Sequence, residues 1–217
     1  MRTFARGNGA NLDGSQTKWH TSRMANDSAA SGKRQGAFSL RIPEGDTRER
    51  EVCGTCGFVN YVNPKIVTGA VVRADDGRIL MCRRAIEPGR GLWTIPAGYL
   101  EEHETVEAAA RREAREEASA DIVLEALLAV YSIPRLSQVQ LIYKARLVTS
   151  AVAPGPESLE TMLVHFAEIP WRSLAFPSVQ WALRHFAQVR DHDVFMPFTN
   201  PVGETGDFAP REVGGDF

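Results

Sequence analysis

Three glutamates, Glu113, Glu116 and Glu117, lie close together in a segment rich in Ala, Glu and Arg. If this segment is a helix, successive residues turn by about 100°, and the three carboxylates share one face with small apolar residues. Arg111 and Arg115 then fall on the opposite face, which we expect to meet water. Carboxylates on a protein-facing stripe repel each other and lose hydration, so they need a compensating partner. Hard oxygen ligands are those that Mg²⁺ prefers, particularly when a substrate phosphate completes the coordination.

The same segment permits a second interpretation, a solvent-exposed helix stabilised by ion pairs along its surface. Glu107 with Arg111, and Arg112 with Glu116, have the four-residue spacing that such pairs need. An acidic helix taken alone is more often of this kind. The facing of the carboxylates weakens this alternative without eliminating it.

The elements that must position these side chains can be predicted from apolar patterning. A helix is expected over 105–120, with Thr105 as its N-cap, and a second over 178–190, where apolar residues recur at helical spacing. Asp-Gly between two apolar runs predicts a hairpin turn that ends at Gly77. Prolines predict a loop over 151–160. Strands are predicted for five apolar segments: 66–74, 78–84, 122–133, 139–148 and 162–166.

The polar residues around the helix have a recognisable order. The chain runs Gly98, five residues, Glu104, seven residues, Arg112-Glu113-Ala114, one residue, Glu116-Glu117. This order strongly resembles the Nudix box, G-x5-E-x7-R-E-U-x-E-E-x-G-U, where U is a bulky aliphatic residue, and all six polar or Gly positions through Glu117 match. Ala114 and Ala120 are small where U is expected, and Ser119 replaces the last Gly. Ser119 is expected to strain the turn that leaves the helix, because Gly takes positive φ there most easily.

The resemblance implies the Nudix fold, a mixed sheet in an α/β/α sandwich, and a role for each matching residue. Glu113 and Glu117 would be metal ligands, joined by the Gly98 carbonyl, and Glu116 a ligand or a group that positions water. Arg112 and Glu104 would brace the loop by pairing. The metal would be Mg²⁺, with Mn²⁺ as the alternative, acting as a Lewis acid on the bridging phosphates while water attacks phosphorus.

The base that activates this water must be a carboxylate within reach. Glu116 is one candidate, and Glu157 and Glu160, in the predicted loop, are candidates outside the box. Together the residues implied for catalysis are Glu116, Glu113, Arg112 and Glu160. Arg84 and Gln138 are predicted to contact the substrate, by position only.

Similarity outside the box narrows the substrate class. The segments NPK (63–65), GLWTIPAGYLE (91–101) and SLAFPS (173–178) resemble a Nudix subgroup of zinc-ribbon-bearing bacterial hydrolases and the plant chloroplast FAD pyrophosphatase. This similarity suggests FAD or ADP-ribose as substrate, cleaved to AMP plus FMN or ribose 5-phosphate. Pyrophosphatases for NADH or ADP-sugars, a nucleoside triphosphate sanitiser and a Nudix-type ligand-binding regulator are the alternatives. The presence of all three carboxylates implied for metal binding, Glu113, Glu116 and Glu117, favours the enzyme over the regulator.

The chain is expected to have four parts: a disordered basic extension (1–35), an incomplete zinc-ribbon-like segment (36–62), the Nudix domain (63–190) and a loosely ordered tail (191–217). The second part contains Cys53-x-x-Cys56, whereas the region where relatives carry a first cysteine pair has neither Cys nor His. A structural zinc site needs four N or S ligands. Zinc is therefore not expected unless a second subunit contributes ligands.

Composition limits the class of partner. The chain has 217 residues with 43% hydrophobic and 24% charged residues, and a net charge of −2 argues against a protein that coats nucleic acid or an anionic membrane. No apolar run approaches the roughly 20 residues that span a bilayer. Three cysteines indicate a reducing compartment, and so a cytoplasmic protein, rather than a disulfide framework. A small nucleotide is the expected partner, and homodimers are common in the family that the chain resembles.

Overall fold

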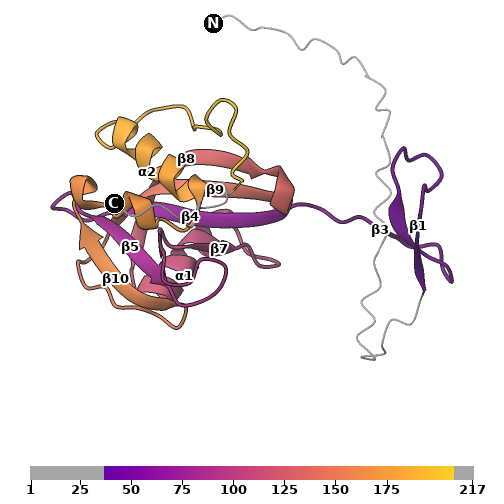
Figure 1. Cartoon of the computed structure of the whole chain (residues 1–217), viewed down its shortest axis with the longest axis horizontal. Coiled ribbons are helices and arrows are strands. Elements are labelled where there is room, and N and C mark those ends of the chain that lie inside the picture. The colour runs from indigo at the N-terminus through magenta and orange to yellow at the C-terminus, as the bar shows by residue number, and fades with distance from the viewer. Residues whose placement is uncertain (1–36, 208–217) are drawn as a thin grey trace, which may run out of the picture. The chain divides into compact units, whose positions relative to one another are not determined.

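A computed structural model describes residues 37–207, which fall into two compact units divided after Tyr61 (Figure 1). The described part of the first unit is an antiparallel sheet of β1 (Phe38–Arg41), β2 (Arg50–Cys53) and β3 (Val59–Asn60). A tight turn joins the last two strands, because the Gly57 N–H donates to the Cys53 carbonyl at 3.0 Å and Gly57 has a φ of 75°. The predicted extension over 1–35 lies outside the described residues.

The second unit is built on a mixed sheet. Its strands are β4 (Lys65–Arg73), β5 (Ile79–Arg84), β6 (Trp93–Thr94), β7 (Ala97–Tyr99), β8 (Ile122–Ile133), β9 (Gln138–Leu147) and β10 (Ser158–Val164). The main order is β10-β5-β4-β9-β8, while β6 pairs with β5 and β7 with β4. The β4–β9 pair is parallel and the other strand pairs are antiparallel. β7 and β4 thus bring Gly98 into the sheet beside the predicted helix.

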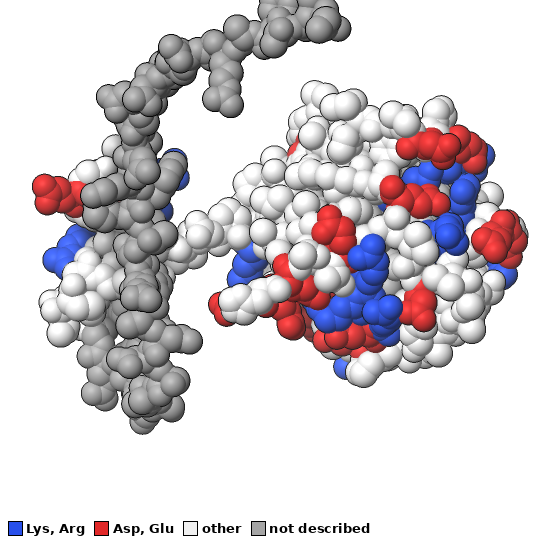
Figure 2. All heavy atoms as spheres, turned by 180° about the vertical axis from the view of Figure 1, so that it is seen from behind, with Lys and Arg blue, Asp and Glu red and all other residues white. Residues whose placement is uncertain are grey.

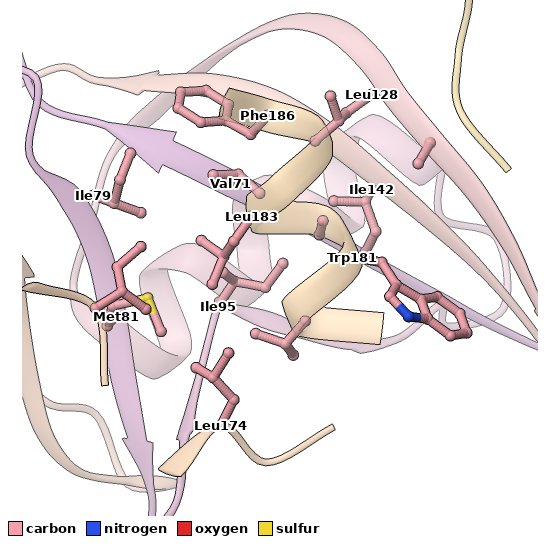
Figure 3. Close-up of a cluster of buried hydrophobic side chains, with 14 of the residues drawn as sticks. Val71, Ile79, Met81, Ile95, Leu128, Ile142, Leu174, Trp181, Leu183 and Phe186 are labelled. Carbon is pink, nitrogen blue, oxygen red and sulfur yellow. The ribbon is translucent and has the colours of Figure 1, made fainter. Parts of the chain in front are cut away.

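The two helices, α1 (Val106–Ala118) and α2 (Pro177–Val189), cover opposite faces of this sheet. Successive residues of a strand point to opposite faces, and in β4 Val71 joins the core that contains α2 residues, whereas Ala70 and Val72 join the core that contains α1 residues. Figure 3 shows the first of these cores, in which Leu183 and Phe186 of α2 pack with Val71. The predicted mixed α/β/α sandwich is confirmed.

α1 contributes small side chains to its core. Ala110, Ala114 and Ala118 are almost completely buried, and so is Ala120 just beyond the helix. Small side chains let a helix lie close to a sheet. Ala114 and Ala120, which depart from the bulky residues of the box, therefore occupy sites where the helix meets the strands.

The structure corrects one predicted boundary. The loop predicted over 151–160 ends earlier, because β10 begins at Ser158, which pairs with Arg84 of β5. Prolines in the loop end at Pro156, so the backbone from Ser158 onward is free to pair. Three short 3-10 turns complete the second unit: Pro134–Leu136, Phe166–Glu168 and Trp171–Ser173. Within the described residues, we find no helix with the length and apolar character that crossing a membrane requires.

Candidate active site

The helix that carries the glutamates is closed at both ends by local contacts. At its start the Thr105 hydroxyl accepts a hydrogen bond from the Ala108 N–H at 3.2 Å, as expected for an N-cap. At its end Ser119 adopts the left-handed conformation, with φ 50° and ψ 29°, and its N–H donates to the Arg115 carbonyl at 2.9 Å. Ser119 thus takes the positive φ that was expected at the last Gly position of the box.

Two of the three glutamates are buried against β7. Glu113 is 8% exposed and Glu117 5%. The Glu113 carboxylate lies so close to Gly98 that a β-carbon there would overlap it, while Glu117 Oε2 accepts a hydrogen bond from the Ala97 N–H at 3.2 Å. The Glu116 side chain is 57% exposed. A side chain at position 98 would therefore displace the Glu113 carboxylate from its place against β7.

The Arg112 guanidinium connects the acids with the loop before the helix. Its Nε and Nη2 each donate to Glu104 at 3.0 Å, and Nη2 also donates to the Tyr99 carbonyl at 3.0 Å. Its Nη1 donates to Glu113 at 2.6 Å and to Glu116 at 2.9 Å. The ion pair with Glu116 is the one that the solvated-helix interpretation required, but it belongs to a larger network that includes a buried acid.

Burial makes negative charge unfavourable in this site. It raises the pKa of Glu117 to about 8, against the opposing hydrogen bond from Ala97, and the charges of Glu113 and Glu157 add to the increase. Burial is also the largest cause that raises the pKa of Glu113, and Glu116 and Glu157 contribute through like charge. A bound cation stabilises the ionised form of neighbouring carboxylates that repel one another and are partly shielded from water.

The carboxylate and carbonyl oxygens of this site fit a hard divalent cation by their chemical type, although the side chains do not converge on one point. Among residues 37–207 no three His, Cys, Asp or Glu side chains converge as a metal site would. Here Arg112 and the Ala97 N–H engage the carboxylate oxygens instead. Carboxylate and carbonyl oxygens are nevertheless the ligands that Mg²⁺ takes.

A pocket of about 770 Å³ opens over these acids. Its charged lining includes Arg112, Glu113, Glu116 and Glu117 of α1, Glu157 from the loop before β10, and Arg84 from β5. Its apolar lining includes Ile86, Ile133, Leu136 and Phe176. Acidic and basic side chains also lie side by side on the surface of the second unit (Figure 2). A pocket with a charged part and an apolar part suits a ligand that has both a charged group and an apolar group.

The structure brings most of the predicted site residues to this pocket. Gly98, Arg84 and Gln138 line it together with the box residues. Arg84 Nε donates to the Pro88 carbonyl at 2.8 Å and its guanidinium stacks over the Phe176 ring at 5.1 Å from the centroid. Gln138 Nε2 donates to the Tyr99 hydroxyl at 2.9 Å.

Glu160 does not line the pocket. It lies in β10 and accepts a long hydrogen bond, 3.5 Å, from Arg83. Glu157, the other candidate in this segment, does line it. Sequence reasoning did not assign Phe176 or Gly206, which also contribute to the lining. No local pattern identifies Gly206, since it reaches the pocket only through the path of the C-terminal segment.

The first unit carries two thiols at one turn. Cys53 is buried and Cys56 exposed, and both are free. Hydrogen bonds from the backbone of Cys56 and of Thr55 lower the pKa of the Cys53 thiol. These are two of the four ligands that a structural zinc site needs, so residues 37–61 alone do not complete such a site.

Comparison with known proteins agrees with both units. A family model described as NUDIX domain matches residues 63–198, and one described as Nudix N-terminal, a zinc-ribbon segment, matches residues 36–62. The second match removes support from the expectation that zinc does not bind. A solved NUDIX hydrolase from Nitrosomonas europaea is 41% identical, with a TM-score of 0.71, over 76% of this chain and 94% of that one.

Two curated relatives match over shorter stretches. An ADP-ribose pyrophosphatase from Methanocaldococcus jannaschii is 35% identical over 74 residues, which are 34% of this chain and 43% of the relative. An NAD-capped RNA hydrolase, NudC, from Stutzerimonas stutzeri is 28% identical over 138 residues, or 63% of this chain and 48% of the relative. The chain thus spans less than half the length of either curated relative.

Proposed function

Because the chain belongs to the NUDIX family, we propose that it hydrolyses the pyrophosphate bond of a nucleoside diphosphate derivative, FAD or ADP-ribose, and releases AMP. The observation that carries this proposal is the burial of Glu113 and Glu117 at a pocket that also has an apolar lining. Buried like charges on a helix face are costly for a purely structural protein. They are useful where a cation and a charged phosphate must be bound together.

Glu113 and Glu117 would hold Mg²⁺ or Mn²⁺, with Glu116 and the Gly98 carbonyl completing the protein ligands. The cation supplies Lewis-acid stabilisation of the charge that spreads over the phosphate oxygens. Arg112, which now pairs with Glu113 and Glu116, holds these carboxylates in place from outside the ligand set. Arg84 adds a positive charge to the pocket that can face a phosphate oxygen.

The water that attacks phosphorus needs a carboxylate base, and we assign this role to Glu157. Glu157 lines the pocket and lies near enough to Glu113 and Glu117 to raise the pKa of both. Glu160 is directed to Arg83 and lies outside the pocket lining. A base must be within hydrogen-bond reach of the water it deprotonates. Glu157 meets this requirement because it lines the pocket. Glu116, which lines the same pocket, is the second candidate for the base.

The substrate class is supported by the lining and by the relatives. A nucleoside diphosphate derivative has a pyrophosphate that a cation held by the glutamates can bind, and flat rings that suit the apolar lining, which includes Phe176. The relative from Methanocaldococcus jannaschii is named for ADP-ribose and that from Stutzerimonas stutzeri for an NAD cap. Both names refer to compounds in which a nucleotide is linked to a second group through a pyrophosphate.

The test is to incubate the protein with Mg²⁺ and FAD, ADP-ribose, NADH or a nucleoside triphosphate, and to separate the products by chromatography. AMP from FAD or ADP-ribose supports the proposal. Binding of these nucleotides without any product supports the ligand-binding regulator and overturns the enzyme. Glu157→Gln and Glu160→Gln form a matched pair in the same segment. Loss of turnover confined to Glu157→Gln supports its assignment as the base, and loss confined to Glu160→Gln refutes it.

A further inference from the structure

The segment 198–207, here called the C-terminal strap, is bonded to the outer edge of the main sheet. β8 is the last strand in the sheet order, and the Phe198 N–H donates to the Leu128 carbonyl while the Val130 N–H donates to the Phe198 carbonyl, both at 2.9 Å. The Asn200 amide continues this pairing, since Oδ1 accepts from the Ser132 N–H at 2.9 Å and Nδ2 donates to the Ser132 carbonyl at 2.8 Å. The strap therefore covers part of an edge that would otherwise present unpaired backbone groups.

The far part of the strap is fixed by a second set of contacts. Asn200 Nδ2 also donates to the Glu204 carbonyl at 3.0 Å, which folds the strap back on itself. Asp207 accepts hydrogen bonds from Thr205 Oγ1 at 2.6 Å and from Arg135 Nε at 2.8 Å. Gly206 is thus held between anchors on both sides.

Gly206 is the point where the strap reaches the pocket. It is buried, has a φ of 77° and contributes to the pocket lining together with Ile133 and Leu136. A β-carbon built on it would lie 2.5 Å from Ile133 Cδ1 and 3.3 Å from the Trp181 ring. The strap backbone therefore packs closely on Ile133, and a methyl group at position 206 would have to displace the end of that side chain.

We propose that the end of the strap, residues 204–207, is a specificity-determining wall that contacts the organic part of the substrate. The pocket residues that can bind a cation or a phosphate come from α1, β5, β7 and the loop before β10, whereas Gly206 lies against the apolar residue Ile133. A ligand whose pyrophosphate lies at the glutamates directs its rings to such apolar lining. The strap then contributes to binding of the substrate and makes no contact with the atoms that react. The NUDIX match ends at residue 198, so this wall, residues 204–207, lies outside the matched domain.

This inference rests on the proposed function, because the ligand is the same substrate. Two shortened chains test it, one ending at Gly203 and a control ending at Asp207. Both keep Phe198 and Asn200 on β8, and only the first lacks Gly206 and Asp207. We expect KM for the preferred substrate to rise about tenfold in the chain ending at Gly203, the lower end of what one lost apolar contact does in a pocket.

The expected turnover number stays within about twofold of that of the control, because no group that acts on the reacting atoms is removed. An unchanged KM in the chain ending at Gly203, with an active full-length chain, overturns the wall and leaves the proposed function standing. A full-length chain that cleaves neither FAD nor ADP-ribose refutes the proposed function instead.

A pair of single substitutions keeps the test valid if the shortened chain does not fold. Gly206→Ala places a methyl group against Ile133, whereas Val202→Ala alters a fully exposed side chain of the same strap. We expect a several-fold rise in KM at constant kcat for Gly206→Ala only. A fall in kcat at constant KM for Gly206→Ala would refute the proposed contact between the strap and the substrate. That result would indicate a general loss of folded protein, which lowers kcat and does not change KM.

Discussion

Replacing Glu117 with Gln should stabilise the metal-free protein at neutral pH while removing its activity. Gln keeps the size of the side chain and an oxygen that can accept the hydrogen bond from the Ala97 N–H. It removes the negative charge, whose burial raises the pKa of Glu117 to about 8 from an ordinary value of 4.5. The change therefore separates the cost of the charge from the contacts of the side chain.

The sign and size of the effect follow from proton linkage. The folded state binds the Glu117 proton more tightly than the unfolded state, so this group lowers the free energy of unfolding as pH rises from about 4.5 to about 8. The loss is at most about 1.4 kcal/mol per pH unit. Between pH 5 and pH 7.5 it amounts to about 3 kcal/mol, a value that depends directly on how far the pKa is raised.

Urea unfolding in the presence of EDTA, at pH 5 and at pH 7.5, measures this difference. Glu117→Gln should match the wild type within about 1 kcal/mol at pH 5 and exceed it by about 4 kcal/mol at pH 7.5. The control is Glu102→Gln, which removes an exposed carboxylate from the loop before α1 and should follow the wild type at both pH values. Excess Mg²⁺ should narrow the gap at pH 7.5 by stabilising only the wild type. Identical pH dependence in wild type and Glu117→Gln would refute the argument.

Three further predictions concern groups that hold the site. Arg112→Lys loses the two-pronged contact with Glu104 and should lower kcat/KM by about tenfold to a hundredfold, as measured in a Mg²⁺ titration. Ser119→Gly relieves a φ of 50° and should raise the free energy of urea unfolding by about 0.5–1 kcal/mol, whereas Ser119→Ala should not. Gly155→Ala pushes a methyl group against the last turn of α1, which displaces the loop that carries Glu157, and should lower kcat by about tenfold or more in steady-state assays.

Features of the structure that depend on neighbouring residues in the chain could be predicted from the sequence. α1 begins after Thr105 and ends before Ser119 because the cap and the left-handed turn are local. Helical periodicity placed all three glutamates with the apolar stripe. The burial of Glu113 and Glu117 confirms this prediction for two of them, whereas it is wrong for Glu116, whose side chain is 57% exposed.

Features of the structure that depend on contacts between distant segments could not be predicted from the local sequence. β10 starts at Ser158 because it pairs with β5, and the prolines before it gave no sign of that pairing. Glu157 and Glu160 look equivalent in the sequence, yet Glu157 lines the pocket and Glu160 accepts a hydrogen bond from Arg83. Gly206 reaches the pocket only because the strap is bonded to β8.

The small residue at position 114 and the electrostatics of the site are connected through the position of α1. Ala114, buried where a bulky residue is usual, lets α1 lie close to β4 and β7. The same approach brings Glu113 against Gly98 and Glu117 against the Ala97 N–H, where water is largely excluded. Exclusion of water is what raises the pKa of Glu117 and makes the metal-free site unfavourable at neutral pH. A larger side chain in place of Ala114 should therefore lift the helix from the sheet and lower the pKa of Glu117 toward its ordinary value, which would flatten the dependence of stability on pH.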